Sequence, residues 1–212
     1  MRTRLPKAGR KRRASGRKET IFRFPAKATI FDEKHPSRYL YQLRSGRLQV
    51  SCGRGVILDY LRAGDFFGEE CFLPPKRRCL SAKSITPTSV AALRVSQVLD
   101  RLRRDPRFAR GFVNGLAGRL DWRTQTIRDF VREPAERRLA ALLYRLTPGK
   151  SGIGWVALHF NPSNSELART IGTTRARISY FLGGFQRMGW LQRRPELRIR
   201  REGLREFLES GA

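Results

Sequence analysis

Residues 160–191 constrain the fold of this chain more tightly than any other stretch, because they specify two helices and the turn between them. Ser163 and Glu166 have the S-x-x-E spacing of a capping box, which marks the start of a helix. Gly172 lies where that helix should end, since glycine readily adopts the left-handed backbone that stops a helix. Thr173-Thr174 can then cap a second helix. The segment therefore predicts a helix pair joined by a short turn.

The apolar positions of this segment indicate how the two helices pack. Leu167 and Ile171 lie at helical spacing in the first helix, and we expect them to be buried. Ile178 and Phe181 return to the same core from the second helix, while Ala168 leaves room for a close crossing. These offsets are the requirements of a helix-turn-helix, with an ordinary helical hairpin as the alternative. In a helix-turn-helix, the second helix enters the major groove of duplex DNA.

The side chains at the start of the second helix are the candidate DNA contacts. Arg175 can pair with guanine through two hydrogen bonds, whereas Ala176 can touch only apolar surface such as a thymine methyl group. Arg177 and Thr174 are better placed for phosphates, which position a protein without specifying sequence. Two strand-like runs around Arg194-Pro195-Glu196 predict a wing, with Arg198 and Arg200 also available to phosphates. The predicted DNA-binding residues are Thr174, Arg175, Ala176, Arg177, Ser179, Tyr180, Arg193 and Arg194.

The charge of the chain agrees with a polyanionic partner. Lys and Arg total 45 against 18 acidic residues, which gives a formal net charge of +27. A field of this sign attracts nucleic acid first and an anionic membrane surface second. Residues 1–18 contain many basic residues and no acidic one, so we expect a disordered tail. That tail either stays in solvent or adds non-specific phosphate contacts.

The first half of the chain has the pattern of short strands separated by turns. Residues 39–43 and 47–51 flank Ser45-Gly46, which predicts a hairpin, and residues 56–61 follow the turn at Gly53-Arg54-Gly55. Residues 21–24 and 89–95 have similar strand-like patterns. Turns that recur every 8 to 12 positions indicate a sandwich or a barrel.

A helical pattern follows the strands. Residues 98–102 suggest a short helix that ends at Asp105-Pro106, and a long helix should cover residues 107–132. Its apolar positions are Phe108, Phe112, Leu116, Leu120, Ile127, Phe130 and Val131. A helix of this length with one apolar seam usually pairs with another helix; packing on its own barrel is the alternative. Gly111, Gly115 and Gly118 would allow a second backbone to approach closely. Residues 135–146 predict a further amphipathic helix, which Pro148-Gly149 should end.

Barrel, long helix, helix-turn-helix and wing, in this order, resemble the CRP/FNR family of bacterial transcription regulators. The best-matching motifs are RAGDFFGE at residues 62–69 and GTTRARIS at residues 172–179. The resemblance implies an α+β protein with a jelly-roll β-barrel of the cyclic-nucleotide-binding type at residues 19–104. It further implies a dimerisation helix at 105–132 and a winged helix-turn-helix at 133–212. The implied function is sequence-specific, homodimeric DNA binding that a small ligand controls, and the implied partners are double-stranded DNA, a second copy and RNA polymerase.

The resemblance also implies a ligand pocket. In the family, a Gly-Glu pair binds the ribose of a cyclic nucleotide, and a downstream Arg followed by Ser or Thr binds its phosphate. The corresponding residues here are Gly68, Glu69, Arg78, Cys79, Arg123 and Thr124. Cys79 and Arg123 depart from the family pattern, which argues against cyclic AMP itself and leaves another cyclic nucleotide or another ligand. The alternative is an internal ion pair between Glu69 and Arg78 in a regulator that needs no ligand.

The remaining chemistry of the sequence is sparse. Cys52, Cys71 and Cys79 have no C-x-x-C spacing and are too few for a four-cysteine cluster, so we expect no metal and no disulfide framework. Cys71 is either redox-sensitive or a small buried side chain. Neither His35 nor His159 lies beside a candidate nucleophile, and the chain has no phosphate loop, so we expect no enzyme activity. The absence of an apolar run long enough for a bilayer predicts a cytoplasmic protein. A general nucleic-acid-binding protein remains the alternative function.

Overall fold

The computed structural model describes residues 12–13 (backbone only), 19–33, 35–53, 55–75, 77–147, 154–158 and 160–210. The chain forms two compact units, residues 1–122 and 123–212, and each is described by itself. Within the described ranges, no helix is both long and apolar enough to cross a membrane.

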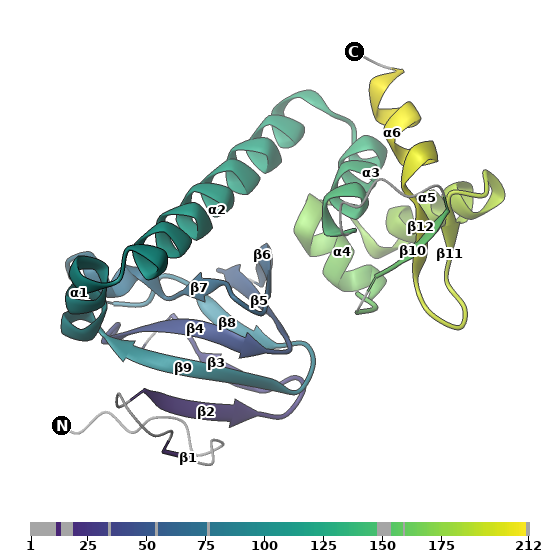
Figure 1. The fold of residues 1–212 in the computed structure, drawn as a ribbon. Coiled ribbons are helices and arrows are strands. Elements are labelled where there is room, and N and C mark those ends of the chain that lie inside the picture. The colour runs from purple at the N-terminus through teal and green to yellow at the C-terminus, as the bar shows by residue number, and fades with distance from the viewer. Residues whose placement is uncertain are drawn as a thin grey trace. The chain divides into compact units, whose positions relative to one another are not determined.

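The first unit is a jelly-roll of two antiparallel sheets (Figure 1). One sheet has the order β1 (Arg12–Arg13), β2 (Thr20–Phe24), β9 (Thr88–Arg94), β4 (Tyr39–Ser45) and β7 (Phe66–Phe67). The other has the order β3 (Thr29–Phe31), β8 (Ser81–Ser84), β5 (Arg47–Cys52) and β6 (Val56–Arg62). The predicted jelly-roll is confirmed, although its two sheets do not close into a barrel. Of the basic tail, the described part is β1, whose two residues pair with Ile21 and Thr20.

Aromatic and aliphatic side chains fill the space between the two sheets. The rings of Phe31, Tyr41 and Phe67 stack on one another, with centroids 5.3 to 5.9 Å apart. Leu43 and Leu48 are fully buried beside them. Along β5, Leu48 and Val50 alternate with more exposed positions, as expected for a strand with one face in a core, whereas in β4 both Leu40 and Tyr41 are buried. The segments that the sequence predicts to be strands therefore pack around one hydrophobic core.

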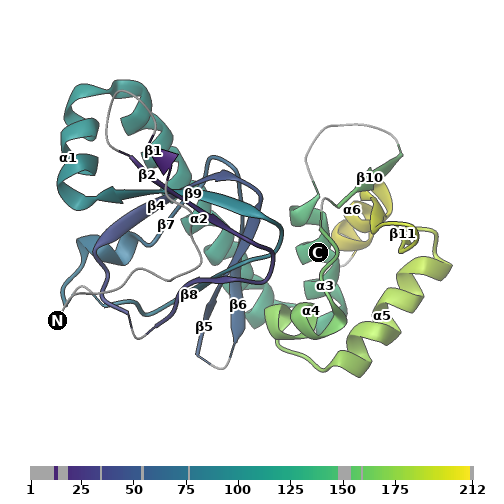
Figure 2. The same cartoon turned by 90° about the horizontal axis from the view of Figure 1, so that it is seen from below.

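The predicted hairpin at Ser45-Gly46 is wrong. The strand before it, β4, pairs with β7 and β9, whereas the strand after it, β5, pairs with β6 and β8. Figure 2 shows β5, β6 and β8 side by side, apart from β4 and β9. Gly46, at φ 86°, carries the chain from one sheet to the other, and a Cβ there would collide with the Pro87 carbonyl oxygen. The glycine is thus required at a corner rather than in a hairpin turn. The strands that precede Gly53 and follow Gly55, β5 and β6, are paired, as the prediction of a turn between them requires.

Two helices follow the jelly-roll: α1 (Val95–Arg104) and α2 (Pro106–Arg132). Both match the sequence expectation to within a few residues. The Asp105 carboxylate accepts the Phe108 backbone N–H at 3.0 Å, which caps the start of α2. Phe108 and Phe112 then pack edge-on against Phe66, with centroids 5.5 and 5.2 Å away. The start of the predicted apolar seam therefore lies on the jelly-roll, which was the alternative for the whole helix.

The described residues of the second unit form the end of α2, four helices and a small sheet. The helices are α3 (Ala135–Leu146), α4 (Asn164–Ile171), α5 (Arg175–Arg187) and α6 (Arg201–Glu209). The sheet has the order β10 (Trp155–Ala157), β12 (Arg198–Arg200) and β11 (Leu191–Gln192). The sequence did not predict α6 or β10. The predicted bounds of α3 are confirmed, and Thr147 is its C-cap; the predicted stop at Pro148-Gly149 lies outside the described residues.

Candidate functional site

Helices α4 and α5 form the helix-turn-helix that the sequence predicts (Figure 2). Ser163 and Glu166 make the capping box, with each side chain accepting the other residue's backbone N–H, at 3.2 and 2.8 Å. Gly172 has φ 67° and ends α4, and the Thr174 hydroxyl accepts the Arg177 N–H at the start of α5. Because each end of the turn is fixed by a local hydrogen bond or a glycine, the angle between α4 and α5 is well defined.

One face of α5 is buried and the other is open. Ile178, Phe181, Leu182 and Phe185 lie in the core, as expected for the first two. The opposite face carries the exposed side chains Arg175, Ala176, Arg177, Ser179 and Tyr180, and the Tyr180 side chain is 71% exposed. Within the part of the chain that the structure describes, neither Arg175 nor Arg177 forms an ion pair. The predicted base-contacting residues therefore share one accessible face with unneutralised positive charge.

Asn164 connects this face to the wing. Its side-chain N–H donates to the Ser179 hydroxyl at 2.7 Å, and its Oδ1 accepts a hydrogen bond from Arg193 at 3.0 Å. The amide thus links the first residue of α4, the exposed face of α5 and the strand region after β11. Arg194 is exposed nearby in sequence, while Arg198 pairs with Glu196 at 2.9 Å. Nothing local in the sequence marks Asn164 as a functional residue, because its partners lie 15 and 29 positions away.

The long helix α2 carries a second exposed surface. Val113, Leu120, Ile127 and Val131 are 59, 68, 64 and 79% exposed. The first three are spaced by seven residues, which is the repeat of a coiled-coil seam. We call these four residues the α2 stripe. A row of large apolar side chains in water is unfavourable, so the α2 stripe is a candidate contact surface for another helix.

In the jelly-roll, the predicted ligand residue Glu69 begins a short 3₁₀ helix, η1 (Glu69–Phe72). Its carboxylate accepts a hydrogen bond from Arg119 of α2 at 2.9 Å. The same guanidinium donates to Asp59 at 3.1 Å and to the Phe66 carbonyl oxygen at 3.0 Å. Burial on its own would lower the pKa of the Arg119 guanidinium, but Glu69 and Asp59 outweigh burial and raise this pKa above its ordinary value. Arg119 therefore stays charged and holds two carboxylates.

Arg78, the predicted phosphate-binding residue, has a side chain that is only 1% exposed. Its guanidinium donates to the Glu70 carboxylate at 3.0 Å, to the Gly68 carbonyl oxygen at 2.8 Å and to the Tyr39 carbonyl oxygen at 2.6 Å. It also stacks over the Phe31 ring, 4.2 Å from the centroid. Gly68 has φ 82°, and a Cβ there would lie 2.5 Å from the Arg78 Nη1 atom, so a side chain at this position would strain the backbone and displace the guanidinium.

The expected alternative, an internal ion pair between Glu69 and Arg78, is wrong. Arg78 pairs with the next residue, Glu70, and Glu69 pairs with Arg119. Cys79 is exposed, and its sulfur lies 3.8 Å from a Glu70 oxygen. Gly68, Glu69, Arg78 and Cys79 thus lie close together. Arg123 and Thr124 lie on the part of α2 that belongs to the second unit.

Comparisons with known proteins agree with both units. Residues 21–105 match the model of the cyclic nucleotide-binding domain, and residues 137–207 match that of the Crp-like helix-turn-helix domain. A CRP-like cAMP-activated global transcriptional regulator of Mycobacterium tuberculosis is 25% identical over 175 residues, 80% of this chain and 78% of the relative. The chain belongs to the CRP/FNR family of transcription regulators.

Solved structures share the fold of this CRP/FNR regulator. A CooA mutant from Carboxydothermus hydrogenoformans superimposes with a TM-score of 0.74, at 24% identity over 90% of this chain and 88% of the other. A CRP/FNR-family transcriptional regulator from Thermus thermophilus has a TM-score of 0.71, at 21% identity over 91% of this chain and all of the other. The order of elements that the sequence indicated is therefore the order of this family.

Two residues that pair with the predicted ligand residues of this regulator, Arg119 and Glu70, were not predicted from the sequence. Arg119 reaches Glu69 across 50 positions and Asp59 across 60. Glu70 directly follows the recognised motif, but its burial and its pairing with Arg78 become evident only in the structure. A run of two acidic residues beside a family arginine was the available signal, and it did not indicate which carboxylate would pair.

Proposed function

We propose that this regulator binds DNA as a homodimer and reads a two-fold symmetric site with its two α5 helices. The observation that carries this proposal is the α2 stripe, which offers a seam for a second copy, together with the exposed face of α5. A dimer would place its reading helices on half-sites about 10 to 10.5 base pairs apart, centre to centre. We expect such a protein to act in the cytoplasm, where it meets both the chromosome and RNA polymerase.

The dimer is tested by placing a charge on the α2 stripe. Leu120→Asp should convert the protein to monomers in sedimentation experiments and weaken binding to a palindromic duplex, because two aspartates would face each other in an apolar seam. Leu99→Asp is the matched control: Leu99 is an exposed leucine of α1, outside the stripe, and the variant should remain dimeric. A Leu120→Asp protein that stays dimeric would disprove the proposed seam.

Base reading is tested by selecting bound duplexes from a random pool, with and without cyclic AMP and cyclic GMP. We expect a palindromic motif. Arg175→Ala should relax the preference at one position of each half-site, worth about 1–3 kcal/mol for a bidentate contact with guanine. Arg194→Ala should weaken all duplexes alike and reduce the salt slope by about 1. A uniform loss from Arg175→Ala would contradict its assignment to a base, and an unenriched pool would favour general polyanion binding.

We further propose that a small ligand in the jelly-roll controls DNA binding. The match to the cyclic nucleotide-binding domain and the name of the mycobacterial relative support a cyclic nucleotide. Such a ligand would have to exchange with the existing ion pairs, taking Glu69 from Arg119 and Arg78 from Glu70. Exchange at Glu69 would reach α2 directly, because Arg119 lies on that helix.

The second candidate is a regulator that needs no ligand, and the two internal ion pairs, Glu69 with Arg119 and Arg78 with Glu70, favour it. Thermal unfolding with a panel of cyclic nucleotides separates the two. A binder present at 100 times its dissociation constant should stabilise the protein by about 2.7 kcal/mol. Arg119→Gln sharpens the test, because it should increase the affinity for a nucleotide that competes with Arg119 for Glu69. No stabilisation of either protein by any nucleotide would favour ligand-independent regulation.

A further inference from the structure

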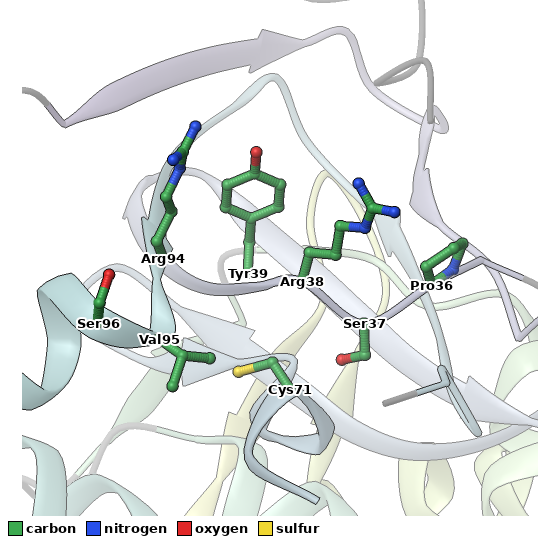
Figure 3. A pocket seen from close by; sticks show the side chains of 8 residues that line it. All are labelled: Pro36, Ser37, Arg38, Tyr39, Cys71, Arg94, Val95 and Ser96. Atoms are coloured by element: carbon green, nitrogen blue, oxygen red, sulfur yellow. The ribbon is translucent and has the colours of Figure 1, made fainter. Parts of the chain in front are cut away.

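A pocket of about 520 Å³ opens on the first unit, at the junction between β9 and α1 (Figure 3). It is lined by residues 36–39 at the entry to β4, by Cys71 of η1, and by residues 94–96, where β9 passes into α1. Neither Glu69 nor Arg78 lines it. The pocket therefore has a different lining from the predicted nucleotide site, although Arg78 donates to the carbonyl oxygen of Tyr39, which lines the pocket.

Positive charge dominates this pocket. Arg38 and Arg94 flank Tyr39, and Figure 3 shows their guanidinium groups turned the same way as the Tyr39 hydroxyl. Both arginines are exposed, and neither forms an ion pair with a residue that the structure describes. No aspartate or glutamate is among the described residues that line the pocket. Two cations without a carboxylate between them favour an anion.

The start of α1 adds hydrogen-bond donors to this charge. The first backbone N–H groups of a helix have no partner within the helix, and they form its positive end. The Gln97 side chain accepts the N–H of Arg94, which precedes the helix, at 2.9 Å. Val95 and Ser96 occupy the first two positions of α1 and line the pocket. A helix start of this kind is a common binding place for phosphate groups.

An independent observation concerns Ser37. This residue is fully buried, and its hydroxyl has no hydrogen-bond partner among the described residues. Figure 3 shows this hydroxyl turned toward Cys71, which also lines the pocket. Buried polar groups in native proteins are nearly always hydrogen-bonded, so an unpartnered one at a pocket indicates a missing partner. Burial raises the pKa of the Cys71 thiol to about 11, so Cys71 is neutral at pH 7 and does not repel an anion.

We propose that this pocket binds a small organic phosphate, with the phosphate group between Arg38, Arg94 and the start of α1. A phosphate monoester carries a charge of about −1.5 to −2 at neutral pH and has three acceptor oxygens, which suits two guanidinium groups and helix N–H donors. The volume is within the range of small-molecule pockets, about 300–1,000 Å³, and exceeds what a bare ion needs. The Ser37 hydroxyl then gains an acceptor or donor from the bound molecule.

The test uses the full chain, without DNA, and ribose 5-phosphate as the probe, followed by calorimetry and thermal unfolding. Arg38→Gln/Arg94→Gln should weaken binding at least about tenfold, because two charge-assisted contacts are lost. Arg103→Gln/Arg104→Gln is the matched control, since it removes the same charge from exposed arginines at the other end of α1. The control should bind within about twofold of the unmodified chain. Ser37→Ala should weaken binding by a smaller factor than the arginine pair.

Several outcomes would overturn the proposal. Absence of binding would do so, as would equal losses in the two double variants, which would indicate a general effect of charge. If inorganic phosphate bound as tightly as ribose 5-phosphate, the pocket would recognise the phosphate group alone, and the proposal of an organic phosphate would be wrong. Displacement of ribose 5-phosphate by cyclic AMP or cyclic GMP would place it in the Glu69 pocket instead. Circular dichroism of each variant shows whether the fold is retained, and the single Arg38→Gln variant repeats the test if the double variant unfolds.

Discussion

Replacing Arg78 by methionine removes a buried guanidinium that serves three oxygens at once. In the unmodified protein it holds the Glu70 carboxylate and the carbonyl oxygens of Gly68 and Tyr39, with a side chain 1% exposed against 8% for Glu70. Methionine is similar in length and apolar, so the cavity term is small. What remains is a buried carboxylate without its cation, and breaking a buried pair in this way costs about 3–5 kcal/mol. We expect Arg78→Met to destabilise the jelly-roll by this amount without any ligand present.

A double variant separates the charge from the rest of the contact. Arg78→Met/Glu70→Gln removes both charges, so the penalty of the isolated carboxylate disappears. Two carbonyl oxygens still lack their donor, at about 1 kcal/mol each, which leaves roughly 2 kcal/mol of destabilisation. The double variant should therefore be more stable than the Arg78→Met single variant by about 1–3 kcal/mol. Recovery of stability on adding a second substitution is the signature of a structural ion pair.

The assay is urea unfolding followed by far-ultraviolet circular dichroism, with hydrogen exchange of the β4 and β8 amides. Tryptophan fluorescence is less suitable, because Trp122, Trp155 and Trp190 lie outside the strands of the jelly-roll. Arg23→Met, at an exposed position of β2, is the control and should change stability little. If Arg78→Met left stability within about 0.5 kcal/mol of the unmodified protein and only abolished nucleotide binding, the structural account would be refuted. Arg78 would then be a ligand residue first.

Three further predictions concern other parts of the chain. Gly172→Ala should destabilise the second unit by at least about 1–2 kcal/mol in thermal unfolding, because φ is 67° and the new Cβ would lie 2.7 Å from a ring carbon of Phe130 in α2. Gly184→Ala is the control and should not destabilise the unit, because Gly184 lies inside α5 with open space around it. Asn164→Ala should blur base preference in the duplex selection more than it lowers overall affinity, since the residue positions the recognition helix and wing without being a base contact itself; an unchanged motif would contradict this. Iodoacetamide should label exposed Cys79 well before buried Cys71. The free energy of unfolding should fall as pH rises from about 8.5, the ordinary thiol pKa, towards about 11, because the Cys71 thiol stays protonated over this range in the folded state only.

The helix-turn-helix was predictable because each of its determinants acts within one turn of helix. The capping box needs only Ser163 and Glu166, three positions apart, and Gly172 fixes the turn through its own backbone. Ile178 follows at a spacing that helix geometry alone converts into burial. Local rules and the final structure therefore coincide, and the predicted DNA-binding residues of α5 lie on its exposed face.

The jelly-roll was predictable as a class, but its pairing was not. A serine and a glycine between two strand-like runs look like a hairpin, and the preference that produces this signal is local. In the structure, Tyr41 of β4 lies opposite Ala92 of β9, and Val50 of β5 lies opposite Ala82 of β8. These partners are far apart in the sequence, so register depends on which apolar faces find a common core. A single sequence does not specify that choice locally.

The predicted ligand site around Glu69 was also predictable only in part, and its pairing has a consequence for regulation. The motif around Gly68 and Glu69 could be recognised because it is contiguous, whereas Arg119 enters from a helix 50 positions away. A ligand that takes the Glu69 carboxylate must release Arg119 from it, while the same guanidinium also donates to Asp59, which is only 4% exposed. The least costly exchange therefore keeps the contact with Asp59 and breaks only the one with Glu69. Because Arg119 lies one position before Leu120 of the α2 stripe, even this small movement would act on the helix that we propose joins the two copies. Coupling between the Glu69 site and the α2 stripe would thus require no long chain of contacts, since Arg119 contacts Glu69 and lies next to Leu120 in α2.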